Sequence, residues 1–85
     1  MKVRILYFAR LRETFGLNAE HLQLPDGVNT VGALIDHLRQ RGGVWAEELG
    51  PGRAFRVAVN QDMAAADAAL STNDEVAIFP PVTGG

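Results

Sequence analysis

The sequence predicts a small α+β domain, and three observations lead to this fold class. Short runs rich in β-branched and aromatic residues alternate with segments that have helical spacing. Apolar residues make up 47% of 85 residues, which is typical of one globular domain. Turn signals separate the runs, so the predicted order is strand, helix, strand, helix and then three strands.

The first half of the chain contains both of the longer predicted helices. KVRILYF at 2–8 favours a strand, and ARLRETFG at 9–16 has helical spacing that ends at a glycine. EHLQL at 20–24 is a weaker strand that stops at the turn sequence Pro-Asp-Gly. The clearest helix follows Thr30, a good N-cap. Its apolar residues recur at helical spacing, at Val31, Leu34, Ile35 and Leu38.

The second half of the chain is richer in strands. VWAEELGPG at 44–52 indicates a short turn of helix followed by a loop, in which the two adjacent glutamates are interpreted as solvated charges. FRVAV at 55–59 predicts a strand, 60–62 a tight reversal, and 63–65 the return strand. EVAIF at 75–79 predicts the last strand.

A parallel pairing of the first and last strands, with the main helix packed across one face, would bury these elements. This arrangement is the β-grasp, or ubiquitin-like, roll, with a mixed sheet of four to five strands. We assign residues 1–79 to the β-grasp domain and residues 80–85 to an extended C-terminal tail.

Composition argues against several classes of function. The net charge of −2 offers no basic footprint for nucleic acid, and no apolar stretch approaches the length needed to span a bilayer. The chain begins without the pattern of a signal peptide, so we expect a cytoplasmic protein with no membrane or nucleic-acid partner. It contains no cysteine, and neither of its two histidines has a second ligand at metal-binding spacing, so we expect no metal site. No nucleophile–base pattern or phosphate-binding loop is found, so the chain is not expected to be an enzyme on its own or to bind a cofactor.

The main helix can cover only one face of the sheet, so pleat alternation predicts a second, uncovered face. The residues predicted to point away from the helix are Arg4, Leu6, Phe8, Arg56, Ala58, Glu75, Ala77 and Phe79. Phe8 and Phe79 would form an exposed aromatic pair, with Met63 nearby, which is typical of a protein–protein interface. The alternative is that the helix at 9–16 folds back and covers them.

The chain ends in IFPPVTGG, a stretch suited to chemistry at the terminal carboxylate. Pro80 and Pro81 favour a stiff, extended exit, and the six residues from Pro80 can reach about 20 Å. Gly84 and Gly85 carry no side chain, so they can thread a narrow channel. Once an enzyme converts the carboxylate to an acyl adenylate, a sulfur nucleophile can displace AMP and leave a thiocarboxylate, or an amine can form an amide.

Three segments closely resemble the small subunits of molybdopterin synthases, a family of ubiquitin-like sulfur carriers. They are VRILYFARLRETFG at 3–16, VAVNQ at 57–61 and DEVAIFPPVTGG at 74–85. Length and element order agree over essentially the whole chain, and the differences fall in the glycine-rich segment GGVWAEELGPGRAF.

The resemblance implies a route for sulfur. An ATP-dependent activating enzyme would adenylate Gly85, and a sulfurtransferase or cysteine desulfurase would supply the sulfur of a thiocarboxylate. The tail residues Pro80, Pro81, Val82, Thr83 and Gly84 would insert into the large subunit of the synthase. There the sulfur would pass to cyclic pyranopterin monophosphate and build the dithiolene of molybdopterin.

The resemblance also implies an assembly of two large and two small subunits, in which the catalytic groups belong to the large subunit. ATP would be used by the activating enzyme, with no cofactor held by this chain. The positions that match the family's contact with its partners are Phe8, Met63 and Phe79, and Arg12 matches a position near the tail.

Three alternatives stay open on the sequence. A carrier of sulfur for thiamine or another thiolated product shares the fold and the Gly-Gly end, although that family is typically shorter and lacks Pro-Pro before the tail. A ubiquitin-like modifier would form isopeptide bonds with lysines from the same terminal carboxylate. A plain β-grasp binding module would carry the tail only incidentally.

Overall fold

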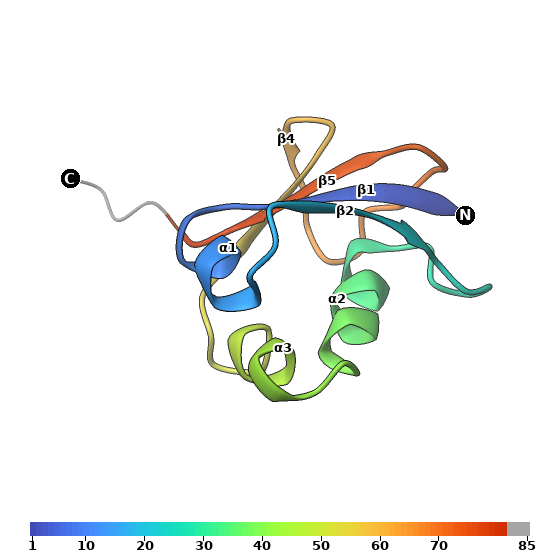
Figure 1. Ribbon diagram of the computed structural model, residues 1–85. Helices are drawn as coiled ribbons and strands as arrows, with labels where there is room; N and C mark the ends of the chain where they lie inside the picture. The colour runs from blue at the N-terminus through green and yellow to red at the C-terminus, as the bar shows by residue number, and fades with distance from the viewer. Residues whose placement is uncertain (82–85) are drawn as a thin grey trace.

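The computed structural model describes residues 1–81 (Figure 1). Within them the elements are β1 (Lys2–Tyr7), α1 (Ala9–Phe15), β2 (Ala19–Gln23), α2 (Val31–Arg39), α3 (Gly43–Glu48), β3 (Arg56–Val59), β4 (Asp62–Met63) and β5 (Glu75–Phe79). This order confirms the predicted one, with α3 as the short helix that precedes β3. Among residues 1–81, no helix is both long enough and apolar enough to cross a membrane.

The strands form one mixed sheet in the order β2-β1-β5-β3-β4. β1 and β5 run parallel, with Tyr7 beside Ile78, and the other neighbours are antiparallel. This topology confirms the β-grasp fold. β5 is the last strand in the sequence but lies between β1 and β3, so the chain leaves the domain from the middle of the sheet.

All three helices lie on one side of the sheet (Figure 1). The Thr30 side chain caps α2 by accepting a hydrogen bond from the Ala33 N–H at 3.2 Å. The four predicted apolar positions of α2 are buried and pack against the inward side chains of the strands. Leu11 of α1 is 0% exposed in this same core. α1 therefore packs on the same side as α2, and the alternative in which it covers the opposite face is wrong.

The return strand β4 is shorter and begins earlier than predicted. It comprises Asp62 and Met63, which pair with Val59 and Ala58 of β3, whereas the sequence predicted a strand at 63–65. Asn60 adopts φ 50° and the next residue φ 72°, the left-handed pair typical of a two-residue hairpin turn. This tight turn sets the register, so β4 starts directly after it.

An aromatic cluster links β1 to α1 and α3. Tyr7 makes edge-to-face contacts with Phe15 and Trp45, each with 5.4 Å between ring centroids. Phe15 and Trp45 stack at 3.8 Å, and the Arg41 guanidinium lies 4.4 Å from the Trp45 ring centroid. Each such contact stabilises the fold by about 0.5–1.5 kcal/mol, in addition to the effect of burying apolar surface. They hold the two short helices, which have little intrinsic stability, against the sheet.

Glu20 of β2 joins this cluster through its carboxylate. Oε2 accepts hydrogen bonds from the Tyr7 hydroxyl at 2.6 Å and from Arg41 at 2.9 Å, and Oε1 accepts a second one from Arg41 at 2.8 Å. Burial raises the pKa of Tyr7, with a further increase from the Glu20 hydrogen bond. Desolvation works to raise the pKa of Glu20, but the hydrogen bonds from Arg41 and Tyr7 outweigh it, so that pKa lies below its usual 4.5.

We expect Glu20→Gln to flatten the acid side of the stability curve. Because the pKa of Glu20 is lower in the folded state, the ionised carboxylate stabilises the fold above pH 4.5, and this contribution is lost as the pH falls through the folded pKa. Between the two pKa values the wild type should lose up to about 1.4 kcal/mol per pH unit through this group. Urea unfolding at a series of pH values would measure the slope.

Glu13→Gln is the matched control for this experiment, because it removes the same charge from an exposed position on α1. The free energy of unfolding of this control should fall at acid pH as steeply as that of the wild type. Equal slopes for Glu20→Gln and the wild type would show that the bonds from Tyr7 and Arg41 do not favour the ionised carboxylate.

Candidate functional site

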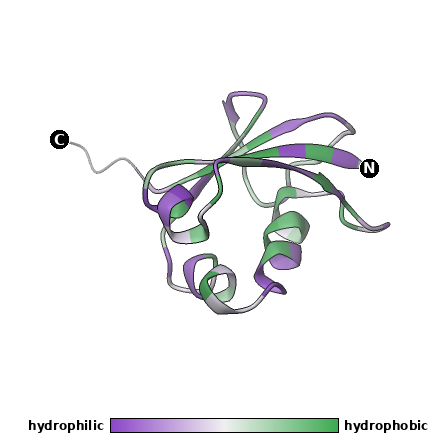
Figure 2. Cartoon of the chain, in the orientation of Figure 1, coloured by the Kyte–Doolittle hydropathy of each residue, from purple (hydrophilic) through white to green (hydrophobic). Residues whose placement is uncertain are grey.

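The face of the sheet opposite the helices is built from rows of side chains across the strands. Strand alternation is visible along β1, where hydrophilic and hydrophobic residues follow one another (Figure 2). Residues directly opposite in neighbouring strands point to the same side. One such row crosses all five strands and consists only of apolar residues, in the sheet order Ala19, Leu6, Ala77, Ala58 and Met63.

A second row lies next to it, at the end of the sheet where β5 leads into the tail. The Phe8 N–H donates to the Ile78 carbonyl at 3.2 Å, so Phe8 continues β1 alongside Phe79. Arg56 of β3 is directly opposite Phe79 on the other side. The row therefore reads Phe8, Phe79, Arg56. We call the eight residues of the two rows the docking face.

Two of the four large apolar side chains of the docking face are exposed, and Leu6 is half-buried. Phe8 is 43% exposed and Met63 is 64% exposed, whereas Phe79 is half-buried. Phe79 is not among the residues that pack against the hydrophobic core of the described chain. The structure thus brings the predicted interface residues Phe8, Phe79 and Met63 onto one uncovered surface, and their role in binding stays a prediction.

The backbone keeps Phe8 on this surface while the chain turns into α1. Phe8 precedes the helix with extended angles, φ −124° and ψ 154°. The reversal occurs at Ala9, whose φ of 53° is a left-handed conformation that costs a non-glycine residue about 1–2 kcal/mol. Because the turn is concentrated in this one residue, the Phe8 side chain stays with the strand and α1 passes to the other side.

The remaining predicted site residues are placed differently. Arg12 is exposed on α1, so it belongs to a helix rather than to the docking face. Pro80 and Pro81 follow β5 directly and are half-buried. The predicted sites at Val82, Thr83, Gly84 and Gly85 lie outside the described residues. The division into a domain ending at residue 79 and a tail stays a prediction.

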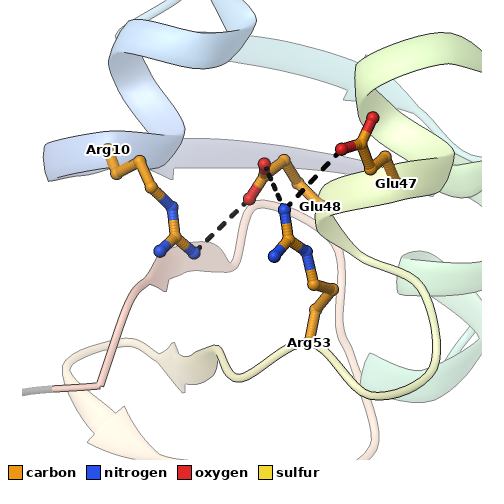
Figure 3. A network of polar contacts seen from close by, with 4 residues as sticks. All are labelled: Arg10, Glu47, Glu48 and Arg53. Carbon is orange, nitrogen blue, oxygen red and sulfur yellow. Dashed lines mark hydrogen bonds and ion pairs between the residues drawn. The ribbon is translucent and has the colours of Figure 1, made fainter.

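A polar network near α1 and α3 was missed from the sequence (Figure 3). Glu48 is only 8% exposed and accepts a hydrogen bond from Arg53 at 3.0 Å, and its other oxygen lies 3.4 Å from Arg10. Glu47 lies farther from Arg53, at 3.8 Å, and is solvated as predicted. The interpretation of Glu48 as a solvated charge is wrong, because adjacent helical residues point about 100° apart and only one of them faces outward.

A cofactor or metal would need convergent polar groups. In residues 1–81, no group of three or more His, Cys, Asp or Glu side chains is placed to hold a metal ion. A hollow of about 550 Å³ lies between α2 and the β3–β4 hairpin. Its lining is mostly small or apolar, with Asp36 and Arg56 as its charged members.

Comparison with known proteins identifies the relatives of this chain. A family model described as the ThiS family matches residues 5–85. The chain belongs to the ThiS family. Among curated relatives, the molybdopterin synthase sulfur carrier subunit of Haemophilus influenzae is 42% identical, over 98% of this chain and 99% of its own length. The Escherichia coli protein of the same name is 40% identical with the same coverage.

Solved structures agree with this family. SAMP1, a small archaeal modifier protein of Haloferax volcanii, superposes with a TM-score of 0.72 at 30% identity, covering all of both chains. A complex of subunits 1 and 2 of molybdopterin-converting factor from Helicobacter pylori contains a chain with a TM-score of 0.69 at 23% identity, again over all of both chains. At that identity the second likeness concerns the fold alone.

Proposed function

We propose that this ThiS-family chain is the sulfur carrier subunit of a molybdopterin synthase, with the sulfur carried on the C-terminus of Gly85. The observation that carries the proposal is its identity of 40–42%, over nearly the full length, to curated proteins of that name. An uncovered apolar face beside the root of the Pro-Pro-Val-Thr-Gly-Gly tail supports it, because a carrier must be held while its terminus reaches into another protein.

Sulfur is attached to Gly85 in two steps, adenylation and then thiolation. The Gly85 carboxylate attacks the α-phosphate of ATP on the adenylating enzyme, forming the acyl adenylate and releasing pyrophosphate. Sulfide, released by a reducing thiol from the persulfide of a sulfurtransferase or cysteine desulfurase, then attacks the acyl carbon and displaces AMP. The product is a thiocarboxylate, and this chain binds no cofactor in the process.

The synthase uses the thiocarboxylate as its sulfur source. The tail from Pro80 to Gly84 enters the large subunit, and the sulfur passes to cyclic pyranopterin monophosphate to form the molybdopterin dithiolene. The large subunit supplies the catalytic groups, so this chain acts as a sulfur-bearing substrate rather than as an enzyme. Two large and two small subunits make up the assembly, and the route operates in the cytoplasm.

The test is an intact-mass measurement. Incubation of the chain with the adenylating enzyme, ATP and a sulfur donor is expected to replace one C-terminal oxygen by sulfur. The mass should rise by the difference between the two elements, and fragmentation should place the change on Gly85. Omission of ATP is the control. An unchanged mass in the complete mixture, with an enzyme that thiolates a known carrier, would contradict the proposal.

A second function is favoured by the likeness to SAMP1, which is a small archaeal modifier protein. An amine can attack the same acyl adenylate, so a lysine of another protein would give an isopeptide bond to Gly85. The same mass experiment distinguishes the two, because conjugation adds the chain to a second protein and leaves no thiocarboxylate.

A further inference from the structure

The cations of this chain divide into two groups according to whether they have a carboxylate partner. The chain has eight lysines and arginines. Within residues 1–81, four of them form ion pairs: Arg10, Arg39, Arg41 and Arg53. All four lie on helices or on the segments that follow them. The four without a carboxylate within 4.0 Å in that part of the chain are Lys2, Arg4, Arg12 and Arg56.

Three of the four cations without a partner lie on the uncovered side of the sheet. Arg56 is part of the docking face, beside Phe79, and because β3 is at the edge of the sheet at this position, Arg56 also lines the hollow beside α2. Arg4 and Lys2 lie on the same side of β1 as Leu6 and Phe8, and they are separated from Phe8 by the apolar row. Arg4 stands next to Glu75 of β5, but no ion pair joins them.

The carboxylates are distributed in the opposite way. The strand residues of the uncovered side contribute one carboxylate, Glu75, so with Lys2, Arg4 and Arg56 the formal charge of that side is +2. The whole chain carries −2, which leaves −4 for the rest of the molecule. A chain that is acidic overall therefore presents a basic surface around its apolar row.

The cations beside the apolar row limit which proteins can bind to the docking face. An exposed cation is stable in water, but burying it in an interface without a counter-ion is strongly unfavourable. A partner whose contact surface were neutral or basic would leave Arg56 desolvated beside Phe79. A partner with carboxylates at matching positions would be attracted before contact and paired after it.

We infer that the docking face, extended by Arg4 and Lys2, selects a large subunit whose contact surface is an apolar patch bordered by Asp and Glu side chains. The inference rests on the proposed function for the identity of the partner. Arg56 is the main specificity-determining residue. Among these cations, it alone belongs to the row with Phe8 and Phe79, next to the start of the tail. Arg4 extends the attraction toward the far end of the sheet.

Charge reversal in the full-length chain tests this inference. Association of the purified large subunit of the same organism with Arg56→Glu, and with Arg4→Glu, would be followed by stopped-flow fluorescence at low and at high ionic strength. We expect each variant to associate about tenfold more slowly than the wild type at about 0.02 M salt. The difference should shrink at about 0.5 M salt because screening shortens the range of the interaction.

Arg39→Glu is the matched control, because it makes the same change in net charge on α2, on the other side of the sheet. It should associate at nearly the wild-type rate. Equal rates for Arg56→Glu and Arg39→Glu would overturn the inference, as would faster association of Arg56→Glu. Arg56→Gln, expected to show an intermediate rate, replaces Arg56→Glu should the latter fail to fold by circular dichroism.

The outcome is separable from that of the proposed function. Thiocarboxylate formation is read from the mass of the isolated chain, whereas the charge inference is read from association rates. A chain that gains sulfur but shows no dependence on Arg56 retains the proposed function and loses the inference. A chain that gains no sulfur loses the proposed function whatever its association rates are.

Discussion

Deletion of Gly85 is expected to abolish sulfur transfer while leaving the fold and the affinity for the large subunit nearly unchanged. The reacting atom is the terminal carbonyl carbon, and removal of one residue withdraws it by about 3.3–3.6 Å. Displacements of about 1 Å in a reacting group already cost about a hundredfold in rate. The described core contains Ile78 as its last residue, so its packing does not depend on Gly85.

Three measurements check this prediction. Intact mass would report loss of thiocarboxylate formation, and product assays with the large subunit would report loss of molybdopterin. Isothermal titration with the large subunit would report retained binding, to within about threefold. A chain extended by one residue after Gly85 is the matched control, because it keeps the tail but blocks its carboxylate, and it should also fail to gain sulfur. Sulfur transfer by the deletion variant would exclude Gly85 as the carrier.

Phe79→Ala is expected to weaken binding to the large subunit about 30-fold while leaving the domain folded. Buried aromatic anchors at the centre of an interface typically contribute about 2 kcal/mol or more, which corresponds to that factor. Phe79 stands between Phe8 and Arg56 on the uncovered face and, within residues 1–81, does not pack against the core. Isothermal titration and thermal unfolding of the variant would measure the two effects.

Phe55→Ala provides the matched control for this substitution. Phe55 is also half-buried, but it packs against the core and lines the hollow beside α2. The Phe55→Ala variant should therefore be less stable than the wild type and bind the large subunit with unchanged affinity. This is the reverse of the result expected for Phe79→Ala. Unfolding of Phe79→Ala at room temperature would show that Phe79 belongs to the core and that the face assignment is wrong.

Most residues of the docking face could be predicted from the alternation of side chains along the strands. Val3, Ile5 and Tyr7 are almost fully buried, and their neighbours point away from the helices, as the sequence predicted. The prediction was possible because pleating assigns every second residue to one side once the strand is recognised. Met63 could not be assigned in this way, because a two-residue strand has no alternation to read.

The polar pairs could not be predicted, since they join residues far apart in sequence. Glu20 and Arg41 are 21 residues apart, and nothing in their local sequences indicates that β2 and the end of α2 meet. Glu48 follows Glu47 in a short helix, and which of the two faces inward depends on how α3 docks against α1. Helical periodicity over six residues is too short to decide this.

The sequence by itself determined the fold class, the burial of α2, the two faces of the strands and the chemistry available to a Gly-Gly terminus. These follow from local periodicity and from residue type, which each segment carries with it. Only the tertiary structure decided that α1 packs on the same side of the sheet as α2, and that three of the four cations without partners lie on the uncovered side. Both depend on which segments become neighbours, because packing and charge pairing act between residues that the chain order keeps apart.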